Sequence, residues 1–406
     1  MGGLSKKAYQ VEQHRNSTTP VLNLDAGNLL FRNKPLPGQE YQSRANAEGI
    51  VNAYNLMAYD GVGVGGLDLA GGLAFLEFLA ERSSFPWLSA NLTRKSSGKR
   101  VFRAYHIRQV GSIAVGIIGL TGSKAAEYLT TDDAVILPWQ EVLPKFVAEL
   151  VRSCDMIILL SDNALQANEE IAQAVPDIDL IMQASAMAGN LPAMQVGNSL
   201  VTQTGRQGKF LGRLTIVWSK SGIWGTDTYR NAFTPLDTDL PDHPQVMKIV
   251  EETKARVNKP GNLVQDFTGD GRAIPPFVGW NTCAGCHEKQ AAFWQTTRHA
   301  GAYRTLVAAR QEYNIDCLPC HVTFLRINSD TPESLRTKLP QLPASMQQVG
   351  CEMCHGAGEK HVGTGDGRSI TRLAGESTCR TCHTPARNDD FNYGEYLKKI
   401  CCPANK

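Results

Sequence analysis

The chain has 406 residues, a length typical of two or three domains. Its formal net charge of +2 excludes the strongly basic surface of a typical nucleic-acid-binding protein or of a basic membrane-binding face. No apolar run reaches the roughly 18 residues that a transmembrane helix needs, so we expect no transmembrane segment.

Residues 1–240 follow an α/β pattern. Amphipathic stretches predict helices, for example from Ala45 to Ala58 and from Trp139 to Arg152, with His14 on a polar helix and His106 in a strand. Short apolar runs between them predict strands at 21–24, 61–64, 112–118, 156–160, 180–182 and 211–217.

Several stretches of this half occur in the order of a known enzyme family: Val21–Asn28, Tyr59–Asp68, Cys154–Asp162, Ile178–Met187 and Gly208–Leu214. Together they resemble the 5′-nucleotidase branch of the calcineurin-like metallophosphatases over about residues 2–220. The resemblance implies an α/β metallophosphatase-like sandwich for residues 1–240.

The residues that carry the chemistry of that family are changed in this chain. Its enzymes hold two metal ions bridged by a carboxylate, with Asn and His ligands and a His that protonates the leaving group. The matching positions are Gly27-Asn28, Gly65-Gly66-Leu67-Asp68, Ala70, Asp162 and Ala184-Ser185-Ala186-Met187. We therefore expect an inactive pseudo-phosphatase domain, no phosphatase activity and no enzyme activity in the chain.

Residues 241–275 predict a connection between domains. The pattern from His243 to Lys259 is that of one amphipathic helix, with Asp242 placed to cap its start. Pro260-Gly261, Gly269–Arg272 and Pro275-Pro276 are then typical of a linker.

Cys-x-x-Cys-His occurs four times in residues 276–406. In this signature of a c-type haem, two thiols add to the porphyrin vinyl groups and the histidine reaches the iron. A zinc ribbon would not need a histidine after every second cysteine. The sequence therefore predicts four covalently attached haem c groups in a mainly α, loop-rich domain, held by Cys283, Cys286 and His287; Cys317, Cys320 and His321; Cys351, Cys354 and His355; and Cys379, Cys382 and His383.

Four haems have eight axial positions, and the motif histidines fill four of them. His299 and His361 follow the first and third motifs too closely to reach the far side of their own haem, so we expect each to cross to a neighbouring haem. No histidine lies between His321 and Cys351. The remaining axial positions are therefore filled by His243, the nearest in sequence, by His106, His14 or Met346, or by a residue of another subunit, or they stay empty.

Trp294-x4-His299 and the stretch from Val349 to His361 resemble the cytochrome c554 family of multihaem proteins, over about residues 277–385. The resemblance implies closely packed haem pairs, mostly with two histidines per iron, and a role in electron transfer.

Haem attachment of this kind takes place outside the cytoplasm, so we expect an exported protein, periplasmic or extracellular. Residues 1–7 lack the apolar segment of a signal peptide, and we expect that signal to lie outside this sequence. Cys154, beside an apolar run, is expected to be a buried inert thiol. Cys401 and Cys402 are expected to be able to form a disulfide, within or between chains.

Three functions follow from these patterns. The first is electron carriage to redox partner proteins or extracellular acceptors, in one version as the subunit of a homopolymeric filament with the pseudo-phosphatase domain as scaffold. The second is a multihaem oxidoreductase that acts on a small nitrogen or sulfur compound at an iron with an open coordination position. The third, residual phosphatase activity, requires bound Mn, Zn or Fe outside haem.

Overall fold

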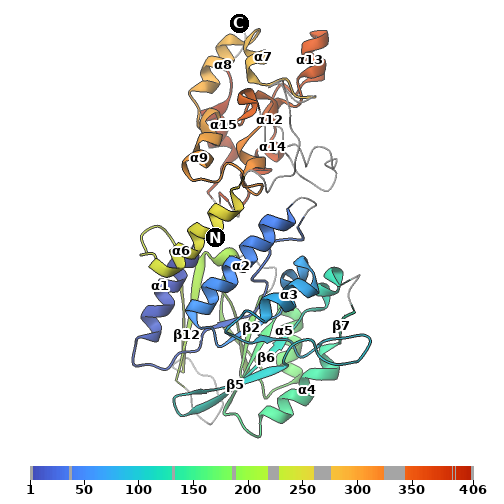
Figure 1. Cartoon of the computed structure of the whole chain (residues 1–406), viewed down its shortest axis with the longest axis vertical. Coiled ribbons are helices and arrows are strands. Elements are labelled where there is room, and N and C mark those ends of the chain that lie inside the picture. The colour runs from blue at the N-terminus through green and yellow to red at the C-terminus, as the bar shows by residue number, and fades with distance from the viewer. Residues whose placement is uncertain are drawn as a thin grey trace. The chain divides into compact units, whose positions relative to one another are not determined.

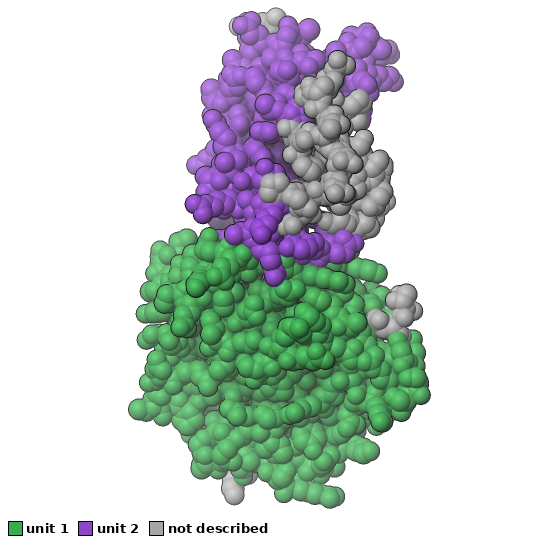
Figure 2. All heavy atoms as spheres, in the orientation of Figure 1, with its two compact units in different colours: residues 1–35, 43–253 green, residues 36–42, 254–406 purple. Residues whose placement is uncertain are grey.

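The structure of the chain is a computed structural model. It describes residues 3–35, 39–129, 133–184, 189–217, 228–259, 276–323, 343–385, 387–388 and 390–403. These residues divide into two compact units, coloured separately in Figure 2: unit 1 contains residues 1–35 and 43–253, and unit 2 contains residues 36–42 and 254–406.

Unit 1 is an α/β structure (Figure 1). Its helices are α1 (Leu4–Arg15), α2 (Glu40–Met57), α3 (Leu73–Ala80), α4 (Trp139–Leu150), α5 (Leu165–Ala174) and α6 (Pro244–Val257), with the 3-10 helices η1 (Gly66–Gly71), η2 (Ser123–Tyr128) and η3 (Arg206–Gly208). Its strands are β1 (Leu24–Asp25), β2 (Gly61–Gly63), β3 (Trp87–Leu88), β4 (Leu92–Thr93), β5 (Tyr105–Val110), β6 (Ile113–Leu120), β7 (Val135–Ile136), β8 (Met156–Ser161), β9 (Leu180–Gln183), β10 (Leu191–Val196), β11 (Ser199–Gln203), β12 (Phe210–Ile216) and β13 (Tyr229–Pro235).

The main sheet of unit 1 has the order β10-β11-β9-β8-β6-β5. Its four inner strands are parallel, and the two edge strands β5 and β10 run antiparallel to their neighbours. A second sheet, β1-β2-β3, is also parallel. β8 is buried along its whole length, as expected of a strand covered on both faces.

The predicted strands are confirmed, with one reduction. Of residues 21–24, only Leu24 forms a strand, together with Asp25, because only these two residues are in register with β2. The predicted helices at 45–58, 139–152 and 243–259 correspond to α2, α4 and α6. His14 lies on α1 and His106 on β5, as predicted.

Unit 2 is built from short helices and loops. They are α7 (Trp280–Ala284), α8 (Glu288–Gln295), η5 (Arg298–Gly301), α9 (Ala302–Ala308), α10 (Leu318–His321), η7 (Ala344–Met346), α12 (Cys351–His355), α13 (Glu359–Thr364), η8 (Gly367–Ser369), α14 (Glu376–Arg380) and α15 (Tyr393–Ile400).

The limits of the two units differ from the predicted domains, 1–240 and 276–406. Residues 36–42 belong to unit 2, where the buried amide of Gln42 donates a 2.9 Å hydrogen bond to the Tyr313 carbonyl and accepts a 3.0 Å bond from Ile315 N. Unit 2 also begins at Lys254, and Asn258 accepts a 2.8 Å bond from Tyr313 N. The predicted linker at 260–275 lies outside the described residues.

Candidate functional site

The four haem motifs all lie in unit 2, each folded as a single helical turn. The His287 N–H donates a 3.0 Å bond to the Cys283 carbonyl, and the His383 N–H donates a 2.9 Å bond to the Cys379 carbonyl. One turn of helix carries residues four apart to the same side. The first thiol and the imidazole of these motifs therefore lie on one side of the turn.

The motifs approach one another in two pairs. The side chain of Cys283 lies next to that of Cys351, so the first motif lies beside the third. The side chain of Cys320 likewise lies next to that of Cys382, which brings the second motif beside the fourth. This pairing joins motifs that are not neighbours in the sequence.

The two extra histidines also lie against motifs that are not their sequence neighbours. The ring of His361 lies beside that of His287, with a centroid separation of 6.2 Å and an interplanar angle of 27°. The ring of His299 lies 6.2 Å from that of His383, at 52°. The structure thus brings each extra histidine to a motif from which it is distant in the chain.

This spacing suits two imidazoles that share one metal ion. Bonds from imidazole nitrogen to a metal are about 2 Å long, so two such rings on opposite sides of one ion have centroids roughly 6 Å apart. Burial, helped for His299 by the nearby His383, lowers the pKa of both His299 and His383. The neutral ring is the form that binds a metal.

The outer nitrogens of three rings are held by backbone carbonyls. Nδ1 of His321 lies 2.8 Å from the Ala302 oxygen, and Nδ1 of His355 lies 2.6 Å from the Thr371 oxygen. A hydrogen bond from Nδ1–H to a carbonyl sets the tautomer and leaves Nε2 free as a ligand. The rings are therefore oriented for ligation through Nε2.

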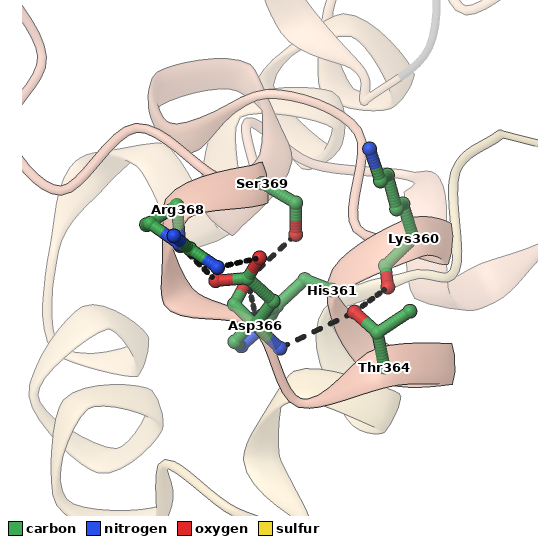
Figure 3. Close-up of polar contacts among 6 residues, drawn as sticks. All are labelled: Lys360, His361, Thr364, Asp366, Arg368 and Ser369. Carbon is green, nitrogen blue, oxygen red and sulfur yellow. Dashed lines mark hydrogen bonds and ion pairs between the residues drawn. The ribbon is translucent and has the colours of Figure 1, made fainter.

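His361 has the most elaborate support of the three (Figure 3). Its Nδ1 lies 3.2 Å from the Asp366 carbonyl oxygen, which also accepts a 2.7 Å bond from the Ser369 hydroxyl. The Asp366 carboxylate in turn accepts hydrogen bonds from the backbone and guanidinium of Arg368. The hydrogen bonds of the turn after α13 thus hold in place the carbonyl oxygen that orients the His361 ring.

The residues of unit 2 fit covalently attached haem in a further respect. The Gln348 side chain is only 6% exposed, and its Nε2 has no hydrogen-bond partner among the described residues. A buried amide donor without an acceptor is costly, and a haem carboxylate would supply one. Phe391 stacks on His383 with ring centroids 4.6 Å apart, an apolar surface of the kind that lines a cofactor site.

The other candidate ligands have different surroundings. His14, His106 and His243 belong to unit 1, and Met346 is buried in unit 2. His243 Nδ1 accepts a 3.4 Å bond from Val246 N, so His243 caps α6 in place of Asp242, whose carboxylate instead contacts Ser5 and Lys6. Its Nε2 lies 3.6 Å from a Glu12 carboxylate oxygen. These contacts explain His243 as a capping residue and give no support to its prediction as an axial ligand.

The remaining cysteines are free thiols. Cys154 is partly rather than fully buried, since it lies at the end of α4 beside Ser153, and burial raises its pKa. Cys401 is exposed and Cys402 partly buried, and they are not bonded to each other.

In unit 1, the altered phosphatase positions form one buried polar network. Asn28 Nδ2 donates to the Asp162 carboxylate and to the Ala184 carbonyl, the latter at 2.8 Å. The Asp68 carboxylate accepts bonds from the backbone N–H groups of Asn28, Leu29, Leu30 and Gly65. Burial raises the pKa of Asp68 to about 7 and that of Asp162 to about 6.

These positions do not gather metal ligands in the described part of the chain, where no group of three or more His, Cys, Asp or Glu side chains could hold an ion. Residues 185–187, which match part of the family's Gly-His-x-His pair, lie outside the described residues.

Comparison with known proteins identifies both halves. Residues 282–356 match the family model described as cytochrome c554 and c-prime. Over 107 residues the chain is 35% identical to cytochrome c-554 of Nitrosomonas europaea, covering 22% of this chain and 43% of that protein. Unit 2 therefore carries a cytochrome c554-like domain, which supports covalently bound haem c and a role in electron transfer.

The amino-terminal half is similar to 5′-nucleotidases. The chain is 29% identical over 251 residues to snake venom 5′-nucleotidase of Naja atra, covering 54% of this chain and 45% of that protein. The solved structure of a 5′-nucleotidase precursor from Thermus thermophilus has the same fold, with a TM-score of 0.55 at 19% identity, covering 74% of this chain and 62% of that one. The chain spans less than half the length of the first curated relatives it matches.

These relatives correct one expectation. From the altered positions we expected no phosphatase activity and no enzyme activity in the chain. The proteins to which it is similar are named as 5′-nucleotidases and phosphoesterases, and this similarity points to possible enzyme activity. The substitutions at individual metal-ligand positions therefore do not exclude enzyme activity.

Several residues that organise unit 2 had no signal in the sequence. Gln42 and the turn from Thr364 to Ser369 act through contacts with distant segments or through backbone carbonyls. For Glu352 a signal was available, since an acidic residue stands between two haem cysteines.

Proposed function

We propose that the protein is an exported tetrahaem c-type cytochrome that carries electrons between partner proteins or to extracellular acceptors. The observation that carries the proposal is the pairing of His287 with His361 and of His299 with His383, each at 6.2 Å. Two imidazoles on one iron favour a six-coordinate, low-spin haem, which is suited to electron transfer rather than to binding substrate.

The residues proposed to hold the cofactors are the eight motif cysteines, as thioether links, and the four motif histidines, as proximal ligands. His361 is proposed as the distal ligand opposite His287, and His299 as that opposite His383. When bound, the haems supply one-electron redox chemistry. The chain supplies attachment, ring orientation and exclusion of water.

Two measurements test this proposal. The intact mass of the mature protein should exceed the polypeptide mass by four haem groups, and electron paramagnetic resonance should show at least two low-spin haems with paired imidazole ligands. A polypeptide with bare thiols would refute the haem assignment. Four haems that are all high-spin would refute the pairing of histidines.

The carrier is further proposed to act as the subunit of an extracellular filament. Support for this comes from the second and third motifs: in the described residues, His321 and His355 face no second imidazole, so a neighbouring copy could donate a ligand. Elongated multimers in negative-stain micrographs are expected. A strictly monomeric protein at high concentration would contradict the filament and leave the carrier intact.

The same observation favours a second candidate, an oxidoreductase that acts on a small nitrogen or sulfur compound at an iron with an open position. It predicts a high-spin haem that binds carbon monoxide or nitrite. Wholly low-spin spectra in the purified protein would exclude it.

Export is supported by the haem chemistry, since covalent attachment of haem c takes place outside the cytoplasm. Among the described residues the structure has no candidate for a membrane-spanning helix. The periplasm and the cell surface are both proposed as locations. Protease treatment of intact cells distinguishes them, since only a surface-exposed protein is degraded.

A further inference from the structure

One buried carboxylate lies within the third haem motif. Glu352 stands between Cys351 and Cys354 and is only 3% exposed. Its two oxygens accept backbone N–H bonds from Val278 at 3.0 and 3.2 Å, from Gly279 at 2.9 Å and from Gly358 at 2.7 Å. A carboxylate held by backbone donors makes strong, charge-assisted hydrogen bonds.

The donors belong to two segments that lead to other ligands. Val278 and Gly279 immediately precede α7, which carries Cys283 of the first motif. Gly358 caps the start of α13, which carries His361. Glu352 therefore joins the first motif, the third motif and the helix of the proposed distal ligand.

The surrounding glycines fit this role. Gly279 has a φ of +82°, a conformation that a side chain would strain. A Cβ on Gly358 would lie 2.9 Å from Val278 Cγ2 and 3.1 Å from Glu352 Oε1. Gly358 can therefore approach the carboxylate because it lacks a side chain, and Gly279 can adopt the backbone conformation that its position requires.

The charge of Glu352 is not balanced by a cation in the described residues, where it forms no ion pair with lysine, arginine or histidine. Its oxygens accept bonds from the two residues directly before the helix of the first motif, so the charge lies close to that motif. A charge buried in a low-dielectric interior acts over a longer distance than an exposed one.

We propose that Glu352 is a buried anion that positions the first and third haem motifs together with His361, and that its charge lowers the reduction potential of the haems attached there. A nearby negative charge stabilises the ferric form relative to the ferrous form, and net charge around a haem is one of the means by which a protein sets the potential. This inference rests on the proposed haem attachment.

The test is a potentiometric titration of the holoprotein in three variants. Glu352→Gln keeps the shape of the side chain and removes its charge, and at least one midpoint potential should rise. Glu352→Asp keeps the charge but is too short to reach all three donors, so the melting temperature of unit 2, followed at the Soret band, should fall. Glu376→Gln is the matched control, because Glu376 is partly exposed beside the fourth motif and pairs with Arg380.

The outcomes distinguish the inference about Glu352 from the proposed function of the protein. Unchanged potentials in folded Glu352→Gln overturn the electrostatic role, as does an equal rise in the Glu376→Gln control. If Glu352→Gln does not fold, the positioning role is tested with Glu352→Asp alone. An unchanged melting temperature and an unchanged haem spectrum in that variant overturn the positioning role. A wild-type protein without covalent haem would refute the proposed function before any variant is measured.

Discussion

The ring centroids of His287 and His361 lie 6.2 Å apart, although His287 belongs to the first haem motif and His361 follows the third, on α13. A single metal ion between them would be bound from both sides. His361 is thereby linked to a haem that its own neighbouring motif does not attach.

Substitution of His361 should leave one haem iron with an empty axial position. In His361→Ala one haem is expected to change from low-spin to high-spin and to bind carbon monoxide, because His287 would remain its only axial ligand. Electron paramagnetic resonance and carbon monoxide difference spectra measure both changes. His14→Ala, on α1 of unit 1, is the control and should leave the spectra as in the wild type. An unchanged number of low-spin haems in His361→Ala would exclude the assignment.

Two glycines beside His361 should respond in opposite directions to the same substitution. Gly356 has a φ of +87° and a ψ of 172°, with open space at its Cβ position, so Gly356→Ala should destabilise unit 2 by about 1–3 kcal/mol through backbone strain alone. Gly363 lies within α13, also with open space, and Gly363→Ala should stabilise the helix by about 0.5–1 kcal/mol. Thermal unfolding followed at the Soret band measures both. Equal shifts in the two variants would contradict the prediction.

The elements of unit 1 and the haem motifs were predictable because their signals are local. Apolar runs predicted β6, β8 and β9, and the spacing of Cys and His within one turn predicted the attachment sites. The sequence also indicated that His299 and His361 would cross to other motifs, since neither has the reach to cap its own haem. It could not say which motif each would meet, because that depends on the packing of α13 and η5 with segments distant in the chain.

Gln42 illustrates what sequence patterns leave out. In the sequence it stands at the start of α2, far from the haem motifs, and nothing around it suggests a contact with residues 313–315. Its amide nevertheless satisfies the Tyr313 carbonyl and the Ile315 N–H just before the second haem motif. Such a contact depends on tertiary structure and has no periodicity that a sequence could reveal.

Gln42→Ala should therefore weaken unit 2. Removal of the amide leaves the buried Ile315 N–H and the partly buried Tyr313 carbonyl without this partner, at a cost of about 1–3 kcal/mol. Gln295→Ala, at the exposed end of α8, is the matched control within the same unit and should change stability by less than about 0.5 kcal/mol. Urea unfolding followed at the Soret band measures both variants. A Gln42→Ala protein as stable as the control would show that water replaces the lost bonds.

The stability of unit 1 should fall as the pH rises through the acidic range. Burial raises the pKa of Asp68 to about 7 and that of Asp162 and Asp179 to about 6, from 3.8. Between pH 4 and these values the unfolded chain loses protons that the folded chain keeps, so the free energy of unfolding decreases with pH. Urea unfolding at pH 5 and pH 7.5, followed by circular dichroism, measures the decrease.

Asp179 allows this pH dependence to be assigned to one group. Its carboxylate accepts a 2.7 Å bond from Ile157 N, and an asparagine oxygen can accept the same bond. Asp179→Asn should therefore fold normally and lose less stability than the wild type between pH 5 and pH 7.5, by an amount on the order of 1 kcal/mol. The same loss in both proteins would mean that Asp179 titrates alike in the folded and unfolded chains. The decrease would then belong to Asp68 and Asp162, which lie in the polar network around Asn28.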